Sequence, residues 1–224
     1  MTVPLADSGR KMPWFYYATQ LGVRSLLVLL SRWQVKGKDN IPRQGPLLVV
    51  ANHLHLADPP ILSVSLVRPA RFMAKEELFH PGVFGYFLRG VGVFPVRRGQ
   101  LDRQALRQAQ QVLADGLALV IFPEATRSRQ ARLQPAFSGA ALIAVRNGVP
   151  ILPIGITGTE KFRGLAWLLR RPRITVNIGH PFSLPPRNGK LSKTELAELT
   201  KFIMGRIAEL LPVEYQGEYA AEVN

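Results

Sequence analysis

The chain has 224 residues, enough for one domain with a core of its own. It carries 29 lysines and arginines against 15 acidic residues, a formal charge of +14, yet 47% of its residues are hydrophobic. The absence of cysteine excludes disulfides and cysteine-ligated metal sites. A surface this basic attracts polyanions, and its combination with so apolar a composition favours a membrane surface over nucleic acid.

Residues 14–34, WFYYATQLGVRSLLVLLSRWQ, predict an amphipathic helix or helical hairpin lying in a membrane interface. Aromatic residues bracket the segment, with Trp14 and Phe15 at one end and Trp33 at the other, as expected for side chains at headgroup depth. Its unbroken apolar run is too short to span a bilayer, and Arg24 opposes spanning. The alternative is an amphipathic helix packed on the protein's own core. We assign residues 1–40 to membrane association and 41–224 to the main domain.

From residue 46 onward, short apolar runs alternate with helical patterns. The predicted strands are 47–51, 71–74, 92–96, 118–122, 151–157 and 173–178. The predicted helices are 59–67, 83–89, 101–115, 136–147 and 193–211. This alternation is typical of a single α/β domain with a central, largely parallel sheet flanked by helices. Ligands of such sheets bind beyond the carboxyl ends of the strands, so the loops after residues 51, 96 and 122 are candidate site loops.

The loop after residue 51, NHLHLAD, holds two of the four histidines in the chain. A histidine five residues before an aspartate can donate its Nδ1–H to the carboxylate, which leaves Nε2 free to take a proton from a hydroxyl. His53 and Asp58 have this spacing. No serine or cysteine stands beside them, so the nucleophile of such a pair would belong to the substrate.

Two other interpretations of this loop compete. Asp58 precedes two prolines, which also suits a helix N-cap. The run is similar to the HxHxDH run of binuclear zinc hydrolases, but its aspartate comes one residue late. Only His80 and His180 remain to complete a ligand set, so we predict no metal site.

The other two loops are basic. The first, GVFPVRRG, ends with Arg97 and Arg98, and the second, FPEATRS, contains Glu124 and Arg127. An arginine three residues from a glutamate can be held by it, with its planar fork directed at a phosphate. The loops therefore predict a proton acceptor beside a phosphate clamp.

Four blocks of the sequence resemble those of the 1-acyl-sn-glycerol-3-phosphate acyltransferases, the PlsC-type glycerolipid acyltransferase family. NHLHLAD resembles its NHx4D block, GVFPVRR its second block, FPEATRS its FPEGTRS block, and VPILPIGI its fourth. AKEELFHPGVFGYFLR is similar to the family segment between the first two. The resemblance covers roughly residues 45–160, with the blocks in the family's order.

The resemblance implies transfer of a fatty acyl group from acyl-CoA or acyl-carrier protein to the sn-2 hydroxyl of lysophosphatidic acid. The product would be phosphatidic acid, and the reaction belongs to phospholipid biosynthesis and needs no cofactor. His53 would be the general base and Asp58 would orient it. The implied substrate-binding residues are Asn52, Lys75, Arg98, Glu124, Thr126 and Arg127. Pro150 and Pro153 would shape the acyl site, and residues 41–224 would form the acyltransferase domain.

The sequence departs from the family pattern at two positions. His55 stands where the family usually has serine, which leaves the tuning of the base open. Ala125 replaces the glycine of the third block. If the backbone there is left-handed, alanine costs on the order of 1 kcal/mol.

Residues 162–171, FRGLAWLLRR, interleave basic and apolar side chains. We expect Trp167, Arg170 and Arg171 to join the N-terminal aromatic residues in contacting an anionic membrane. The protein is then peripheral or monotopic, at the cytoplasmic face of the cell membrane. No basic groove studded with aromatic residues or helix-turn-helix pattern points to nucleic acid.

Two alternative functions stay open. One is an acyltransferase of the same family that acts on another lysophospholipid, glycerol-3-phosphate or an aminolipid. The other is a binder of anionic membranes without catalysis, in which His53 would be dispensable.

Overall fold

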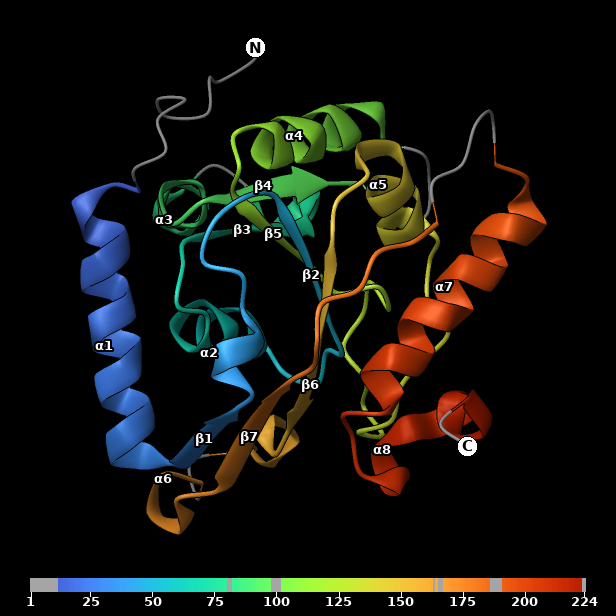
Figure 1. The fold of residues 1–224 in the computed structure, drawn as a ribbon. Coiled ribbons are helices and arrows are strands. Elements are labelled where there is room, and N and C mark those ends of the chain that lie inside the picture. The colour runs from blue at the N-terminus through green and yellow to red at the C-terminus, as the bar shows by residue number, and fades with distance from the viewer. Residues whose placement is uncertain are drawn as a thin grey trace.

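A seven-stranded sheet with the strand order β1-β7-β6-β2-β5-β3-β4 forms the centre of the computed structural model (Figure 1). The structure describes residues 12–79, 82–97, 102–162, 164, 167–185 and 191–222. Within them the strands are β1 (Arg32–Lys36), β2 (Leu47–Ala51), β3 (Ala70–Lys75), β4 (Val93–Val96), β5 (Ala118–Ile121), β6 (Ile151–Thr157) and β7 (Arg173–Ile178). The α-helices are α1 (Trp14–Leu30), α2 (Asp58–Ser65), α3 (Val83–Gly90), α4 (Arg103–Ala114), α5 (Gly139–Asn147), α6 (Trp167–Arg170), α7 (Lys193–Ala208) and α8 (Val213–Gln216).

The connections between the strands single out the position between β2 and β5. The strands β6, β2, β5, β3 and β4 run parallel, whereas β7 is antiparallel to β6 and β1 follows β7. The chain leaves β2 toward β3 on one side, and it leaves β5 toward β6 on the other. Neighbouring strands whose connections depart in opposite directions form a topological switch point, where open α/β sheets bind ligands. The loops that follow β2 and β5 meet there.

Helices cover both faces of the sheet, and β2 is buried on both because each of its residues is fully enclosed. Its side chains alternate: Leu47, Val49 and Ala51 join the cluster under α1 and α2, while Leu48 and Val50 join the cluster under α4, α5 and α7. This explains why β2 is a continuous apolar run rather than an alternating one. The predicted fold class is confirmed.

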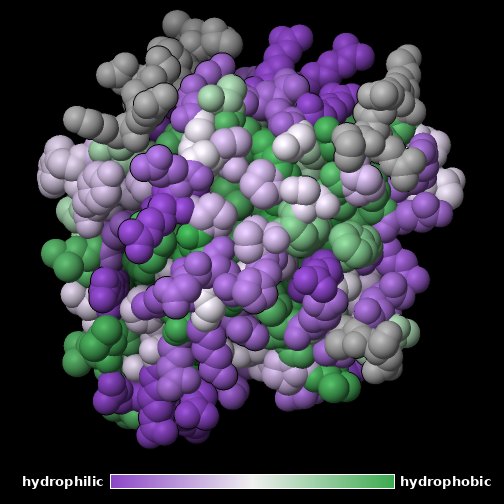
Figure 2. Space-filling view, in the orientation of Figure 1, coloured by the Kyte–Doolittle hydropathy of each residue, from purple (hydrophilic) through white to green (hydrophobic). Residues whose placement is uncertain are grey.

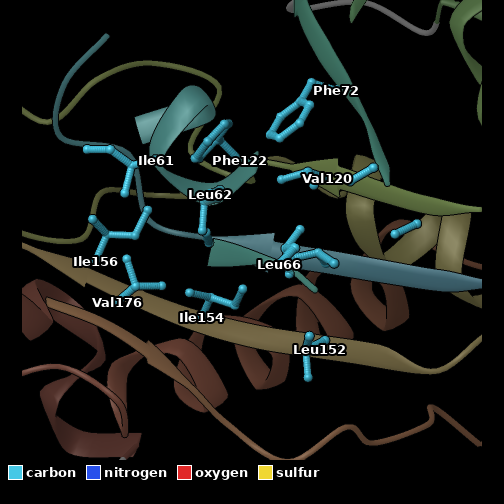
Figure 3. Close-up of a cluster of buried hydrophobic side chains, with 14 of the residues drawn as sticks. Ile61, Leu62, Leu66, Phe72, Val120, Phe122, Leu152, Ile154, Ile156 and Val176 are labelled. Carbon is cyan, nitrogen blue, oxygen red and sulfur yellow. The ribbon is translucent and has the colours of Figure 1, made fainter. Parts of the chain in front are cut away.

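The cluster under α2 reaches the carboxyl edge of the sheet. Figure 3 shows Ile61 and Leu62 of α2 over Ile154 and Ile156 of β6, with Phe122 at the end of β5. Phe122 is the last core residue before the loop that carries the third sequence block. The apolar core therefore ends directly beneath the candidate site.

The N-terminal segment differs from its prediction in one respect. The helix ends at Leu30 rather than at residue 34, and Arg32–Lys36 form the edge strand β1, paired with β7. Trp33 consequently lies on β1, half-buried against the core, and not on the helix. The sequence RWQVK does alternate polar and apolar residues as a half-buried edge strand does, but the alternation covers only five residues and directly follows the helical pattern.

Helix α1 packs on α2 through its polar side chains. Gln20 donates to the Ser63 carbonyl at 2.8 Å and to the Tyr16 hydroxyl at 2.9 Å. The hydroxyl of Ser63 also lies within hydrogen-bond distance of Gln20, so this side chain has partners on α2. Exposed apolar side chains of α1 are Trp14, Tyr17, Leu21, Val28 and Leu29. At the left rim of Figure 2, where α1 lies, green patches alternate with purple ones.

Candidate active site

The His53–Asp58 pair expected from the sequence is present at the carboxyl end of β2. The Nδ1 atom of His53 lies 2.8 Å from Asp58 Oδ2, and both side chains are buried. No other described group forms a hydrogen bond with the Nε2 atom of His53. The carboxylate therefore holds the Nδ1–H tautomer, in which Nε2 carries a lone pair that can accept a proton.

Asp58 does not cap the helix that it begins. Its Oδ2 also accepts hydrogen bonds from the backbone N–H groups of Leu54, at 2.6 Å, and His55, at 2.7 Å. The first turn of α2 contains Pro59 and Pro60, which have no N–H to offer, so the carboxylate turns back to the loop. Its Oδ1 atom is buried without a partner. One oxygen thus fixes both the imidazole and the loop that carries it.

The backbone of His53 is held by the loop after β5. Glu124 Oε1 accepts the His53 N–H at 2.9 Å, and the Ser128 N–H donates to the His53 carbonyl at 2.8 Å. The second oxygen of Glu124 accepts the N–H of Gln134 at 3.0 Å. Glu124 was expected to hold substrate and Arg127, but it is buried and its carboxylate bonds to backbone instead. Sequence spacing could not reveal this, because Glu124 and His53 are 71 residues apart.

Burial raises the pKa of the Glu124 carboxyl to about 7, against the lowering effect of its two backbone donors. Desolvation is the larger influence because the charged form loses its water. The Glu124 carboxyl, which accepts the hydrogen bond from the His53 N–H, therefore gains and loses its proton near neutral pH.

Asn52 connects the end of β2 to β6. Its amide nitrogen donates to the Ile156 carbonyl at 2.9 Å, and its amide oxygen accepts the Ile156 N–H at 2.7 Å. The side chain is buried and uses both ends of its amide in this way. Asn52 was predicted to bind substrate, and the structure gives it a structural contact instead.

Two aromatic contacts flank the loop. The His53 ring stacks on Phe122 with a centroid separation of 4.2 Å, so the apolar core supports the imidazole face. His55 contacts Phe162 edge-to-face and accepts the Ala57 N–H at its Nδ1. Desolvation lowers the pKa of His55, which favours its neutral form. His55 therefore supports the loop rather than duplicating His53.

The predicted phosphate-binding residues are distributed unevenly. Arg127 and Thr126 are exposed on the loop after β5, and Arg127 is near enough for its charge to act on His55. Lys75 ends β3, two strands from β2, and pairs with Glu77 at 2.8 Å. Arg98 lies outside the described residues. The structure thus places Arg127 near the loop of His53 and Asp58, and it places Lys75 at the same edge of the sheet but two strands from β2.

The left-handed backbone suspected at the third block is present, since Ala125 has φ = 55°. A glycine would adopt this conformation without the steric penalty that alanine incurs. Ala125 therefore holds a strained backbone conformation in this loop.

The acyl-site prolines lie elsewhere than predicted. Pro150 precedes β6, at the end of the strand opposite the site, and the buried Pro153 faces away from α2 because side chains alternate along β6. An apolar cavity of about 380 Å³ lies instead between α1, α2, α3 and β3. It begins beside the site loop at Leu56, Pro59 and Pro60.

Within the described ranges, no group of three or more histidine, aspartate or glutamate side chains has a geometry that could hold a metal ion. His80, a conceivable further ligand, falls outside those ranges, and His180 is exposed after β7.

The family model described as Acyltransferase matches residues 32–157, more than half of the chain. The chain belongs to this acyltransferase family. The match runs from β1 to the end of β6 and so contains His53, Asp58 and Glu124.

Individual relatives agree with this assignment. The acyltransferase is 33% identical over 172 residues to a 1-acyl-sn-glycerol-3-phosphate acyltransferase of Streptococcus pneumoniae, covering 72% of this chain and 62% of that one. It is 34% identical over 154 residues to a chloroplastic enzyme of that name from Brassica napus, covering 66% of this chain and 44% of the plant protein. The chain thus spans less than two thirds of the length of these two relatives. A Bacillus subtilis protein of the same name is 27% identical over 84% of this chain and 92% of its own.

A solved structure resembles the acyltransferase over most of its length. The 1-acyl-sn-glycerophosphate (LPA) acyltransferase PlsC from Thermotoga maritima superimposes with a TM-score of 0.64 and 29% identity. The alignment covers 84% of this chain and 76% of that one.

Proposed function

We propose that the acyltransferase moves a fatty acyl group from a thioester, acyl-CoA or acyl-carrier protein, to the sn-2 hydroxyl of 1-acyl-glycerol-3-phosphate. The observation that carries the proposal is the buried His53–Asp58 pair with its free Nε2. The relatives named for this reaction support the choice of acceptor.

The pair can perform the transfer without a nucleophile from the protein. The Nε2 atom of His53 removes the proton of the substrate hydroxyl while the hydroxyl oxygen attacks the thioester carbonyl carbon. Asp58 stabilises the imidazolium that forms, and the carbon–sulfur bond of the tetrahedral intermediate then breaks. The thiolate takes the proton back from Nε2, which releases free thiol and leaves His53 ready for the next cycle. Arg127 supports this assignment because it is exposed, acts through its charge on His55 of the same loop, and can hold the acceptor's phosphate.

The apolar cavity beside the loop suits a fatty acyl chain. Phe72 and Val93 line its sheet side, Leu88 lines it from α3, and Val64 lines it along α2. Val64 lies six residues beyond Asp58, about 9 Å along the helix axis. An acyl chain that entered beside Pro59 would therefore reach Val64 well inside the cavity.

Val64→Phe tests the use of this cavity. The larger ring should shift the preferred donor toward shorter chains while leaving turnover of a short-chain thioester unchanged. Val67→Phe is the matched control, because Val67 is exposed and does not line the cavity. Equal chain-length profiles for both variants would contradict the assignment.

Membrane attachment through α1 is the second part of the proposal. Its exposed apolar side chains extend from Trp14 to Leu29, with Arg24 and Ser25 among them. No helix in the described part of the chain is long and apolar enough to cross a bilayer. Such a helix lies in the interface, with its apolar stripe among the acyl chains. Phe15 takes no part in this stripe, because its ring packs against Gly90 of α3.

Flotation with anionic vesicles tests this attachment. Leu21→Glu together with Val28→Glu should abolish co-flotation, whereas Val213→Glu, at an equally exposed position on α8, should not. Unchanged flotation of the α1 double variant would remove α1 from the membrane contact.

The activity itself is tested by thiol release. Purified protein is given acyl-CoA and 1-acyl-glycerol-3-phosphate, with His53→Ala beside it and His180→Ala as the exposed control. Release that needs the lysolipid and is lost only in His53→Ala is the expected result. Release that survives in His53→Ala would refute the role of His53. Release with a different acceptor alone would replace the proposed substrate with that acceptor.

A further inference from the structure

A second polar region lies at the carboxyl edge of the sheet, away from the His53 site. A pocket of about 720 Å³ opens between β1, β7 and α6. Its lining includes five basic residues: Arg32, Lys161, Arg170, Arg171 and Arg173. Trp167, Pro172 and Glu160 complete it. Figure 2 shows hydrophilic side chains gathered at the lower left, where Figure 1 places α6 and the end of α1.

The basic side chains of this pocket are not neutralised by the described residues. Arg32, Lys161, Arg170 and Arg173 form no side-chain hydrogen bond or ion pair there, and Arg171 donates only to the Val28 carbonyl, at 2.9 Å. Glu160, the acid of the pocket, has both oxygens engaged, by the Tyr215 hydroxyl at 2.8 Å and the Gly158 N–H at 2.9 Å. Five cations against this one carboxylate leave an excess of positive charge, and a bound polyanion would relieve the repulsion between them.

The backbone is also constrained here. Arg171 has φ = 42°, a left-handed conformation for a residue that bears a side chain and precedes a proline. The turn places Arg170 and Arg173 on either side of it, at the mouth of the same pocket. Strain of this kind persists only where surrounding contacts fix it.

The register of the sheet gives the distance to the catalytic histidine. Arg32 pairs with Arg173, Thr175 pairs with Thr157, and β6 runs parallel to β2. Arg173 thus lies two strands to the side of β2 and about three residues farther out along the strand direction. With strands ~4.8 Å apart and ~3.3 Å per residue, the separation from His53 is on the order of 14 Å.

From this placement we propose that the pocket binds the phosphates at the nucleotide end of an acyl-CoA donor. The inference rests on the proposed acyl transfer. The phosphate of the acceptor is joined to its 2-hydroxyl carbon through one carbon and an ester oxygen, too short a link to reach this pocket from His53. The pantetheine arm of coenzyme A is a long flexible link, and it separates the thioester from the nucleotide.

Charge and shape favour the nucleotide over a lipid headgroup. The 3′-phospho-ADP portion of coenzyme A carries several negative charges, which match five cations better than the single charge of a phosphodiester lipid. Trp167 offers an aromatic face for the adenine and packs against Phe162 at 4.4 Å. Phe162 in turn contacts His55, so a continuous wall connects the pocket to the site loop.

Two donors with the same acyl group test the proposal: acyl-CoA, and an acyl thioester of N-acetylcysteamine, which lacks the nucleotide. The test variant is Arg32→Gln with Arg173→Gln, and the control is Arg107→Gln with Arg146→Gln, which changes the net charge equally on α4 and α5. The test variant should raise the KM for acyl-CoA roughly 10- to 100-fold, because each lost charge-assisted contact weakens binding about tenfold or more. Its kcat/KM for the truncated donor should stay unchanged.

Direct binding distinguishes the sources of phosphate. Adenosine 3′,5′-bisphosphate should bind the wild-type protein and the control pair, and bind the test variant more weakly. An unchanged KM for acyl-CoA in the test variant would overturn the proposal. It would also be overturned if the test variant lost only its binding to phosphatidylglycerol vesicles, because the pocket would then be a site for lipid headgroups. Failure of the proposed function would look different, because neither donor would then release thiol with wild-type protein.

Discussion

The two polar regions at the carboxyl edge of the sheet are built in opposite ways. Around His53 the polar groups are buried and bound to one another: Asp58 to the imidazole, Glu124 to the His53 backbone, Asn52 to β6. Around Arg173 the basic side chains are exposed and, within the described residues, almost without partners. The first arrangement fixes atoms in place before substrate arrives, as chemistry requires. The second leaves cations available, as the binding of an anion requires.

Asp58→Asn breaks the first arrangement most severely. The amide can present its NH₂ group to the imidazole, which stabilises the wrong tautomer and leaves a proton on Nε2. Turnover should fall roughly 10³- to 10⁴-fold, as for other His–Asp pairs, while the KM for donor changes little. Asp39→Asn, at an exposed position, is the control. A variant that folds and keeps a tenth of the activity would show that the pair is not the proton acceptor.

Glu124→Gln tests whether burial of this carboxyl limits stability. Because its folded-state pKa of about 7 exceeds its ordinary value of 4.5, the folded protein binds the proton more tightly between these pH values. Wild-type stability should therefore decline as pH rises through that window, by up to ~3 kcal/mol relative to Glu124→Gln. Urea unfolding of both proteins across pH 4–8 measures the difference. Parallel stability curves would mean that the pKa of Glu124 is the same in the folded and unfolded states.

Ionic strength separates the two regions without a mutation. Raising it from about 0.01 M to about 0.1 M shortens the screening length from ~30 Å to ~10 Å, which weakens exposed charges and spares buried ones. The KM for acyl-CoA should rise several-fold, whereas kcat and the kcat/KM for the truncated thioester should stay unchanged. A fall in kcat instead would place the salt-sensitive charges in the catalytic loop.

Ala125→Gly has the smallest expected effect. It removes the left-handed strain of alanine, about 1 kcal/mol, but frees the unfolded chain, so a net gain of about 0.5 kcal/mol is expected. Ala131→Gly, at φ = 56°, should behave alike and so controls for proximity to the site. A lower urea midpoint for Ala125→Gly would mean that the methyl group makes a favourable contact that outweighs its strain.

The sequence predicted what depends on local pattern. Apolar runs located six strands, and the spacing of His53 and Asp58 anticipated a contact that a short loop can close. Edge strand β1 was not predicted because its alternation of polar and apolar residues covers only five residues and directly follows the helical pattern of α1. The structural roles of Glu124 and Asn52 could not be predicted, because their hydrogen-bond partners lie 71 and 104 residues away along the chain. Which way a polar side chain turns, toward substrate or backbone, depends on the assembled sheet.

The two hydrogen bonds between Asn52 and Ile156 have a consequence for the tolerance of that position to substitution. The side-chain amide occupies the place of one more peptide group in the ladder between β2 and β6. Aspartate would offer no donor, serine would fall short of the partner strand, and glutamine would overreach by a methylene. A saturation library at residue 52 should therefore return asparagine almost alone, although this side chain touches no reacting atom.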